Sequence, residues 1–159
     1  MAGGVVIRRG RKADSKGFLK LLVALAKYEK LDPPTPAAQK RILKDVFEKR
    51  RASLVMAIRG GVPIGYAFYF YTYSSFLAKP TLYLEDIFVL KEFRGFGVGK
   101  SLFVRCVKEA SIQGCGRMEW SVLNWNSRAI RFYRRMGARR MGEWSVFRLD
   151  ERALNALVG

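Results

Sequence analysis

The sequence predicts one mixed α/β domain of residues 1–159, built on a single mixed sheet with helices on both faces. Strand-like segments fill the middle of the chain, helices and strands alternate later, and no repeat or Gly/Ser linker divides its 159 residues. Half of the residues are hydrophobic and 13% are aromatic, so a chain of this length can bury one sizeable core.

The first half of the chain is expected to hold two helices and four strands. Asp14 or Ser15 caps the first helix, and the second helix spans about 36–49 after a short proline loop. Gly60 and Gly61 mark a hairpin turn between the second and third strands. The strands are expected at residues 5–9, 53–58, 63–73 and 81–90.

The second half is expected to hold two helices, over 97–113 and up to Met136, and two strands, 117–123 and 144–149. The first helix is entered through a glycine-rich turn, and Asn126 caps the second. One side of the second helix is nearly all arginine, which is usually a solvated face but also suits phosphates. Its arginines are Arg128, Arg131, Arg134 and Arg135.

The chain is strongly basic, which is unusual for a protein in which half of the residues are hydrophobic. Thirty Lys and Arg against 13 Asp and Glu give a net charge of +17, which favours anionic partners. The absence of histidine excludes Ser/His/Asp and Cys/His nucleophiles and most zinc sites, so no metal is expected. Catalysis would then depend on Glu, Asp, Tyr, Lys or backbone groups.

The chain is expected to be a cytoplasmic protein. Cys106 and Cys115 match neither a disulfide framework nor a metal spacing, and both are interpreted as buried thiols. The first residues are too charged for a signal peptide, and the longest apolar run, 66–73, is too short to span a bilayer. Only three Asn and two Gln, beside many charges, favour a thermophile.

The turn from Arg94 to Lys100 is the most informative segment. It follows a strand and opens a helix, so free backbone N–H groups and the helix dipole converge on one point, as in an anion-binding cradle. The alternative is an ordinary glycine-rich turn with solvated cations. The dinucleotide-binding fingerprint does not match, because it needs glycine at position 100, where the chain has Lys100. The phosphate-loop motif does not match either, because it needs glycine at position 94, where the chain has Arg94.

Two adjacent acids, Glu85 and Asp86, interrupt the apolar strand at 81–90. In a regular strand they would face opposite sides, so one acid would point toward a covered face of the sheet. That placement is costly unless the acid is paired or has a function. Either the two acids form ion pairs with nearby arginines, or they belong to a functional site.

The ordered set of strand acid, glycine-rich turn into a helix, and Asn126 followed seven residues later by Tyr133 resembles the GNAT superfamily of acetyl-CoA-dependent N-acetyltransferases. The resemblance runs essentially from end to end. Within the superfamily the chain is similar to the diamine (spermidine/spermine) and thialysine acetyltransferases. That branch is matched by residues 25–29, 69–73, 82–89, 94–99 and 125–133.

The resemblance implies a mostly antiparallel sheet whose fourth and fifth strands splay apart, and it assigns an acetyl-CoA site. The pyrophosphate would lie on the turn, and the pantetheine arm would pair with the fourth strand at Phe88 and Val89. The cofactor-binding set is Phe88, Val89, Arg94, Gly95, Phe96, Gly97, Val98, Gly99, Lys100, Asn126 and Arg135.

The resemblance also implies direct acetyl transfer to a primary amine. An ammonium must lose a proton before it attacks a thioester, and Glu85 is assigned as the base, with partial burial raising its pKa. Tyr133 is assigned as the acid for the departing thiolate. The acceptor-side residues are Tyr28, Glu29, Asp86 and Trp120.

The acceptor stays open between a polyamine, a lysine-like amino acid and a protein lysine. Phe76 replaces a family tryptophan, and +17 should repel a polycation at long range. The basic exterior also suits proximity to nucleic acid. A homodimer is expected, with the C-terminal segment at its interface. The other readings are a non-catalytic CoA-binding module and a basic nucleic-acid-associated protein.

Overall fold

The computed structural model describes residues 4–158, and its elements lie in two compact units, Met1–Ser121 and Val122–Gly159. The expectation of a single domain stays a prediction. No helix within 4–158 is long and apolar enough to cross a membrane.

The first unit contains one five-stranded sheet in the order β1-β2-β3-β4-β5. All neighbouring strands are antiparallel except β4 and β5, which are parallel. The mixed and mostly antiparallel sheet predicted from the sequence is therefore confirmed. The strands are β1 (Val5–Arg9), β2 (Ser53–Arg59), β3 (Val62–Ser74), β4 (Lys79–Val89) and β5 (Arg117–Glu119).

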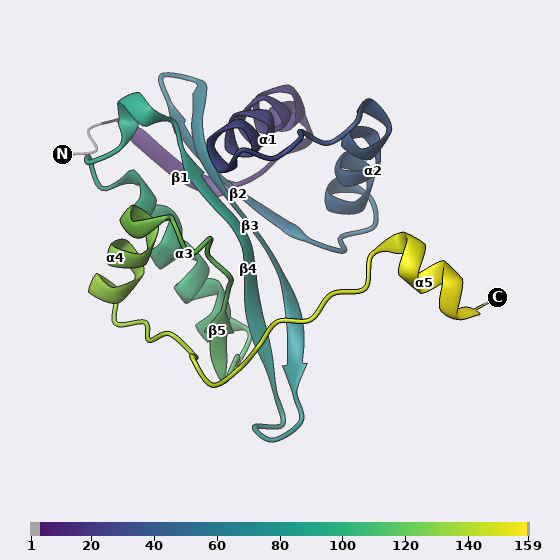
Figure 1. Ribbon diagram of the computed structural model, residues 1–159. Coiled ribbons are helices and arrows are strands. Elements are labelled where there is room, and N and C mark those ends of the chain that lie inside the picture. Colours follow the sequence, from purple (N-terminus) through teal and green to yellow (C-terminus); the bar gives the residue numbers. More distant parts are fainter. Residues whose placement is uncertain (1–3, 159) are drawn as a thin grey trace. The chain divides into compact units, whose positions relative to one another are not determined.

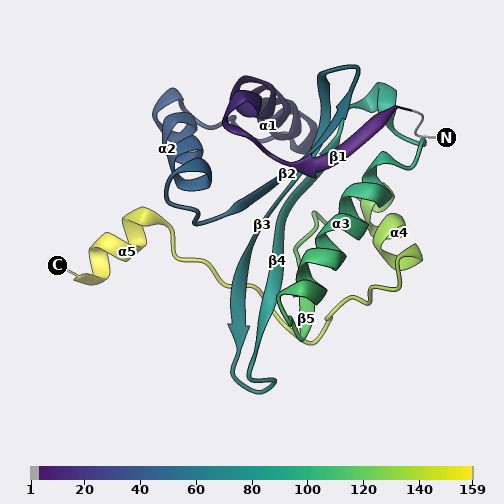
Figure 2. The ribbon, with the colours of Figure 1, turned by 180° about the vertical axis from the view of Figure 1, so that it is seen from behind.

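Helices cover both faces of this sheet, as expected. Figures 1 and 2 show α1 (Ser15–Glu29) and α2 (Pro36–Phe47) on one face and α3 (Val98–Ile112) on the other. The core on the α1 face packs Phe18 edge-on against Tyr66, with ring centroids 5.2 Å apart. On the other face, α3 buries Val98, Leu102, Phe103, Cys106 and Ala110. Cys106 is buried as expected, whereas Cys115 is only half-buried.

The second unit contains α4 (Ser127–Arg135) and α5 (Glu151–Val158). The Asn126 side chain accepts a hydrogen bond from the amide of Ala129 at 3.2 Å, so its predicted cap of α4 is confirmed. Asp150 caps α5 in the same way through the amide of Ala153.

The strand expected at 144–149 is wrong. Among the described residues this segment pairs with no strand, and the side chains of Trp144 and Phe147 are 74% and 93% exposed. An apolar, alternating run has strand propensity, but it becomes a strand only where another strand satisfies its backbone hydrogen bonds. The strand predicted at 117–123 is likewise cut to Arg117–Glu119, the only part that pairs with β4.

Candidate functional site

The acid pair of β4 lies at an irregularity in the sheet. Phe68 of β3 pairs with Asp86 and Tyr69 pairs with Leu84, so Glu85 is an extra residue with no partner on β3. Such a bulge bends a strand and redirects its side chains, which is why bulges are frequent beside active sites. The alternation expected of a regular strand therefore does not apply to these two acids.

Asp86 is the more buried acid, and its carboxylate has a specific partner. The hydroxyl of Tyr66, a fully buried residue, donates a hydrogen bond to Asp86 Oδ2 at 3.1 Å. Burial raises the pKa of Asp86 to about 6, the negative charges of Glu85 and Glu29 add to this rise, and the hydrogen bond from Tyr66 opposes it. Glu85 itself is exposed, so the expected burial falls on its neighbour.

Glu29, at the end of α1, completes an acidic cluster with Glu85 and Asp86. Burial raises the pKa of Glu29, and the charge of Glu85 raises it further. Among the described residues none of the three carboxylates forms an ion pair, although the chain has 30 Lys and Arg. The alternative expected from the sequence, in which these acids form ion pairs with nearby arginines, therefore lacks support.

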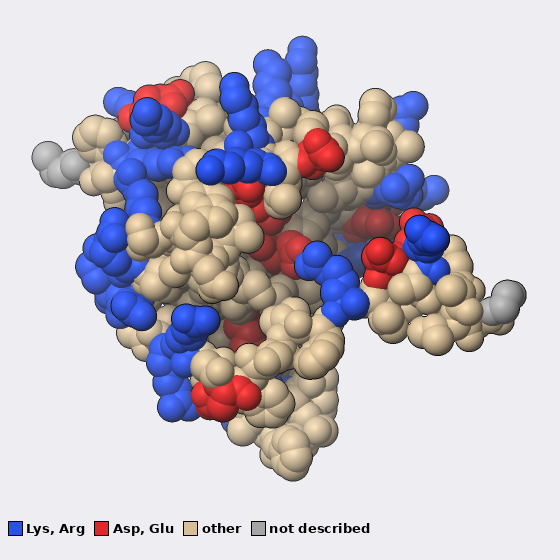
Figure 3. All heavy atoms as spheres, in the orientation of Figure 1, with Lys and Arg blue, Asp and Glu red and all other residues tan. Residues whose placement is uncertain are grey.

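Figure 3 shows acidic atoms gathered near the middle of the visible face, where Figure 1 places the middle of β4. Negative charges that lie together in a partly buried place repel one another and favour a cation between them. The acidic cluster is thus suited to hold an ammonium group.

Arg94 is held by two aromatic rings and by the backbone of β4. Its guanidinium carbon lies 4.7 Å from the ring centroid of Tyr28 and 5.4 Å from that of Phe88. Its Nε donates a hydrogen bond to the carbonyl oxygen of Val89 at 2.7 Å. Stacking and hydrogen bonding together hold the start of the glycine-rich turn against the end of β4.

The fourth and fifth strands diverge as the resemblance implies. β5 pairs with β4 only from Thr81 to Tyr83, and β4 then continues to Val89. On the side where β5 lies, the edge of residues 84–89 has no strand partner among residues 4–158. An open edge of this kind presents backbone donors and acceptors to an extended ligand.

The glycine-rich turn has the backbone geometry of an anion cradle. Gly95 and Gly97 have φ angles of +90° and +84°, which favour glycine, and Gly97 is the N-cap of α3. A Cβ at either position would meet no heavy atom within 4 Å. Within the described chain, no hydrogen bond uses the amides of residues 95–100. The N-terminus of α3 thus leaves several donors open to an anion.

The remaining predicted site residues lie in different surroundings. Trp120 packs edge-on against Phe103 of α3, with ring centroids 5.4 Å apart, whereas Tyr28 and Glu29 belong to α1. In the second unit, Tyr133 is half-buried beside Phe132, and Arg135 is exposed on α4. The structure therefore groups Glu29, Glu85 and Asp86, with Tyr28 next to Glu29 on α1, and it packs Trp120 against α3.

Sequence reasoning missed Tyr66 as a member of the acidic cluster. The available signal was a tyrosine in the apolar run of a central strand, since a buried hydroxyl needs a partner. It also missed the backbone bond of Arg94, which had been assigned only to the cofactor.

Known proteins that are similar to this chain, in sequence or in fold, include several acetyltransferases. Residues 19–138 match the acetyltransferase (GNAT) family. The thialysine N-epsilon-acetyltransferase of Bos taurus is 31% identical, with 98% of each chain covered. L-ornithine N5-acetyltransferase of Arabidopsis thaliana is 45% identical over 60% of this chain and 42% of its own length.

Solved structures show the same fold. An integron cassette protein from V. cholerae has a TM-score of 0.82 and 24% identity, covering 98% of each chain. Aminoglycoside N-acetyltransferase AAC(6')-Iy, in complex with CoA, has a TM-score of 0.77 and 22% identity, covering 92% of this chain and 95% of its own. Together with the family match, the end-to-end similarity shows that the chain belongs to the acetyltransferase (GNAT) family and is an acetyl-CoA-dependent N-acetyltransferase that acts on an amine.

Proposed function

We propose that this enzyme acetylates a small amine that carries at least one further charged group, such as a lysine-like amino acid or a short diamine. The observation that carries the proposal is the acidic cluster of Glu29, Glu85 and Asp86, which has no cationic partner among the described residues. The thialysine and ornithine enzymes named above act on amino acids with a side-chain amine, which supports this class.

The cradle at residues 95–100 and the open edge of β4 fit the phosphates and the extended arm of acetyl-CoA. This co-substrate supplies a thioester, whose acetyl group is transferred without a covalent enzyme intermediate. We assign the residues named for it above, from Phe88 and Val89 through Lys100, with Asn126 and Arg135 in addition. The unused amides and positive φ angles of the turn support that assignment.

Glu85 is proposed as the group that takes the proton from the acceptor ammonium. Its position on the bulge, beside two other carboxylates that attract an ammonium, supports this assignment. Asp86 is proposed to hold the acceptor through its charge, so that protonation of Asp86 near pH 6 weakens binding. Tyr133 remains the proposed acid for the thiolate, and Tyr28 and Trp120 remain proposed acceptor-side residues.

The test of the base is the substitution Glu85→Gln. We expect turnover to fall by about a hundredfold or more, most strongly below the pKa of the acceptor amine, because an ammonium then keeps its proton. Initial rates across pH, with lysine, thialysine, ornithine and spermidine as acceptors, measure this. Glu48→Gln, an exposed residue after α2, is the matched control. A pH-rate profile that Glu85→Gln leaves unchanged would remove Glu85 as the base.

The test of the cradle is the substitution Gly97→Ala. A Cβ at φ +84° is strained by about 1 kcal/mol and disturbs the amides at the N-terminus of α3, so KM for acetyl-CoA should rise. Gly114→Ala is the control, because Gly114 has φ +66° at the other end of α3. Both variants should lose similar stability, and an equal rise of KM in both would contradict the cradle.

A homodimer, a cytoplasmic location and a thermophilic source stay predictions. The unpaired apolar segment at 144–149 supports an interface between copies, since its side chains are exposed within the described chain. The exposed arginines of α4 support proximity to nucleic acid or its bound proteins, which makes a protein lysine the second candidate acceptor.

A further inference from the structure

A cavity lies at the edge of the sheet where β1 ends and β2 begins, and its volume is about 290 Å³. It shares no residue with the acidic cluster or with the glycine-rich turn. The end of β1, the end of α2, the connection that follows α2 and the start of β2 form its walls. The lining residues are Arg9, Gly10, Val46, Phe47, Arg50, Ala52, Ser53 and Leu54.

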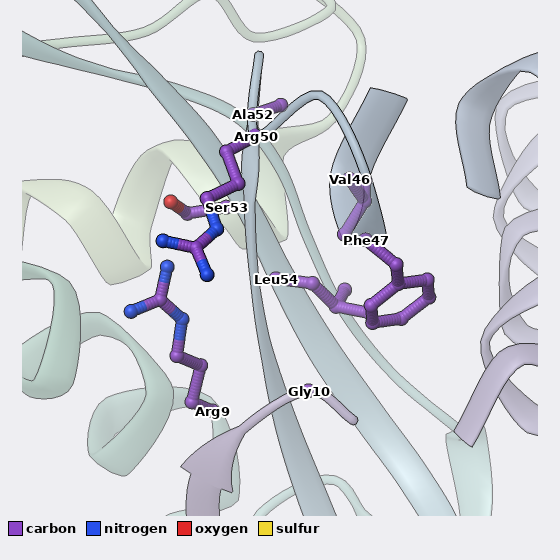
Figure 4. Close-up of a pocket in the computed structure, with 8 residues that line it drawn as sticks. All are labelled: Arg9, Gly10, Val46, Phe47, Arg50, Ala52, Ser53 and Leu54. Carbon is purple, nitrogen blue, oxygen red and sulfur yellow. The ribbon is translucent and has the colours of Figure 1, made fainter. Parts of the chain in front are cut away.

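Two arginines that line this cavity, Arg9 and Arg50, are exposed to solvent and carry the same charge. Figure 4 shows the guanidinium groups of Arg9 and Arg50 pointing toward one another, close to Ser53. Within residues 4–158, neither guanidinium forms an ion pair or a hydrogen bond. Two exposed cations that converge without a counter-ion repel each other only weakly because water and salt screen them, and both attract an anion placed between them.

The adjacent arginines show that carboxylates were available in this region. Arg8, next to Arg9, donates two hydrogen bonds to Asp14, at 2.7 and 2.9 Å. Arg51, next to Arg50, lies 3.6 Å from Asp45, which Lys49 also approaches. Each of these acids is thus paired with a neighbour of Arg9 or Arg50, and among the described residues Arg9 and Arg50 themselves have no acidic partner.

The backbone of Arg50 is also held in an uncommon conformation. Its φ angle is +52°, in the left-handed region that a residue with a Cβ adopts only at a cost of about 1 kcal/mol. Glycine would avoid this cost at the junction between α2 and β2. A strained non-glycine residue whose side chain enters a cavity is a reason to look for a ligand there.

We propose that Arg9 and Arg50 bind the phosphate group of a small organic phosphate. Guanidinium groups present paired N–H donors that match phosphate oxygens, and two of them satisfy a dianion from both sides. The cavity is larger than a phosphate needs, and its apolar lining residues Val46 and Leu54 are buried in the core, whereas Phe47 is half-buried. In Figure 4 the side chains of Phe47 and Leu54 lie across the β2 backbone from the arginines. The two arginines therefore recognise the phosphate group, and the apolar side chains across β2 do not select the rest of the ligand.

Calorimetric titration with phenyl phosphate, at fixed ionic strength and with saturating CoA present, tests this site. CoA occupies the amide cradle, so that its phosphate site does not contribute. Arg9→Ala and Arg50→Ala should each weaken binding by about tenfold or more, since each removes one of two charged donors. Arg51→Ala, which removes the same charge from the adjacent position, should change the affinity by less than about twofold.

Equal weakening by all three substitutions would mean that only the overall positive charge attracts the probe, and would overturn the proposal. Absence of binding by the unchanged protein at millimolar phenyl phosphate would overturn it as well. Arg50→Lys keeps the charge without the paired donors and should lose most of the affinity, while thermal melting verifies that each variant is folded. A short oligonucleotide that binds more tightly than phenyl phosphate through the same two arginines would assign the site to nucleic acid instead.

Discussion

Two acidic regions of the first unit are built in opposite ways. At the start of α1, the carboxylate of Asp14 is 9% exposed, accepts two hydrogen bonds from Arg8, and accepts a third from the amide of Arg11 at 2.7 Å. At the bulge of β4, the Tyr66 hydroxyl is the only hydrogen-bond donor to the Asp86 side chain among residues 4–158, and Asp86 lies among other carboxylates. In the described part of the chain, the first region pairs its acid with an arginine, and the second has three acids without an ion-pair partner.

The difference separates an acid that stabilises the fold from acids available to a ligand. The hydrogen bonds from Arg8 lower the pKa of Asp14, whereas burial raises the pKa of Asp86 to about 6. A chain with a net charge of +17 has ample cations to pair with every acid. Leaving a cluster unpaired therefore costs stability that an arginine would have restored, and a bound ammonium acceptor would offset that cost.

The largest effect on stability is expected when the ion pair between Arg8 and Asp14 is removed. Asp14→Asn leaves the partly buried Arg8 guanidinium without its counter-ion and should lower the free energy of unfolding by about 3 kcal/mol at pH 7. The pKa of Asp14 is lowered on folding, so its contribution is present above the unfolded value near 4 and is lost as the pH falls through the folded value. Denaturant unfolding at several pH values measures both.

Activity per folded molecule should not change in Asp14→Asn. A variant that is as stable as the parent at pH 7, or one whose stability deficit does not shrink toward low pH, would contradict the structural role of this pair.

The substitution Asp86→Asn should raise the free energy of unfolding, whereas Asp14→Asn lowers it. Because folding raises the pKa of Asp86 to about 6, the native state binds an additional proton between pH 4 and 6, and stability falls as the pH rises through that range. Removing the charge should therefore stabilise the protein by about 2 kcal/mol at pH 8 and by little at pH 4. Paired unfolding curves at the two pH values measure this difference.

The same variant should raise KM for the amine acceptor more than it lowers kcat, since the lost charge is proposed to hold the ammonium. A loss of stability at pH 8 would show that Asp86 is needed for folding, and the contrast with Asp14 would then disappear.

The smallest effect is expected for an exposed ion pair. Arg117 Nε lies 2.9 Å from Glu119 Oε1, and the two side chains are 47% and 44% exposed. Glu119→Gln should change the free energy of unfolding by less than about 1 kcal/mol, because water and salt screen the pair. A change as large as that of Asp14→Asn would show that burial is not what distinguishes the regions.

Most of the sheet was predictable because its strands and helices have strong periodic patterns and clear turn residues. The glycines at 60 and 61 have φ angles of +53° and +79°, as the hairpin turn required, and Gly97 opens α3 as the turn motif indicated. The segment at 144–149 shows the limit. Its residues favour a strand, but pairing depends on a partner that is distant in sequence or on another chain.

The site was predictable in its members and not in its arrangement. Glu85 and Asp86 were recognised as exceptional because charged residues are rare in a buried strand. Which of the two is buried depends on a bulge against β3, since one extra residue redirects the side chains around it. Local sequence carries no record of the register between two strands.

The sequence alone thus determined most of the helices and strands, the glycine-rich turn and the unusual acids, since periodicity, backbone freedom and charge are local properties. Only the tertiary structure decided which charges meet. Arg8 donates hydrogen bonds to Asp14, and Tyr66 donates one to Asp86. The guanidinium groups of Arg9 and Arg50 point toward one another at the cavity beside β1 and β2 (Figure 4). Electrostatic interactions depend on distance and burial, and both arise only when segments far apart in the chain pack together.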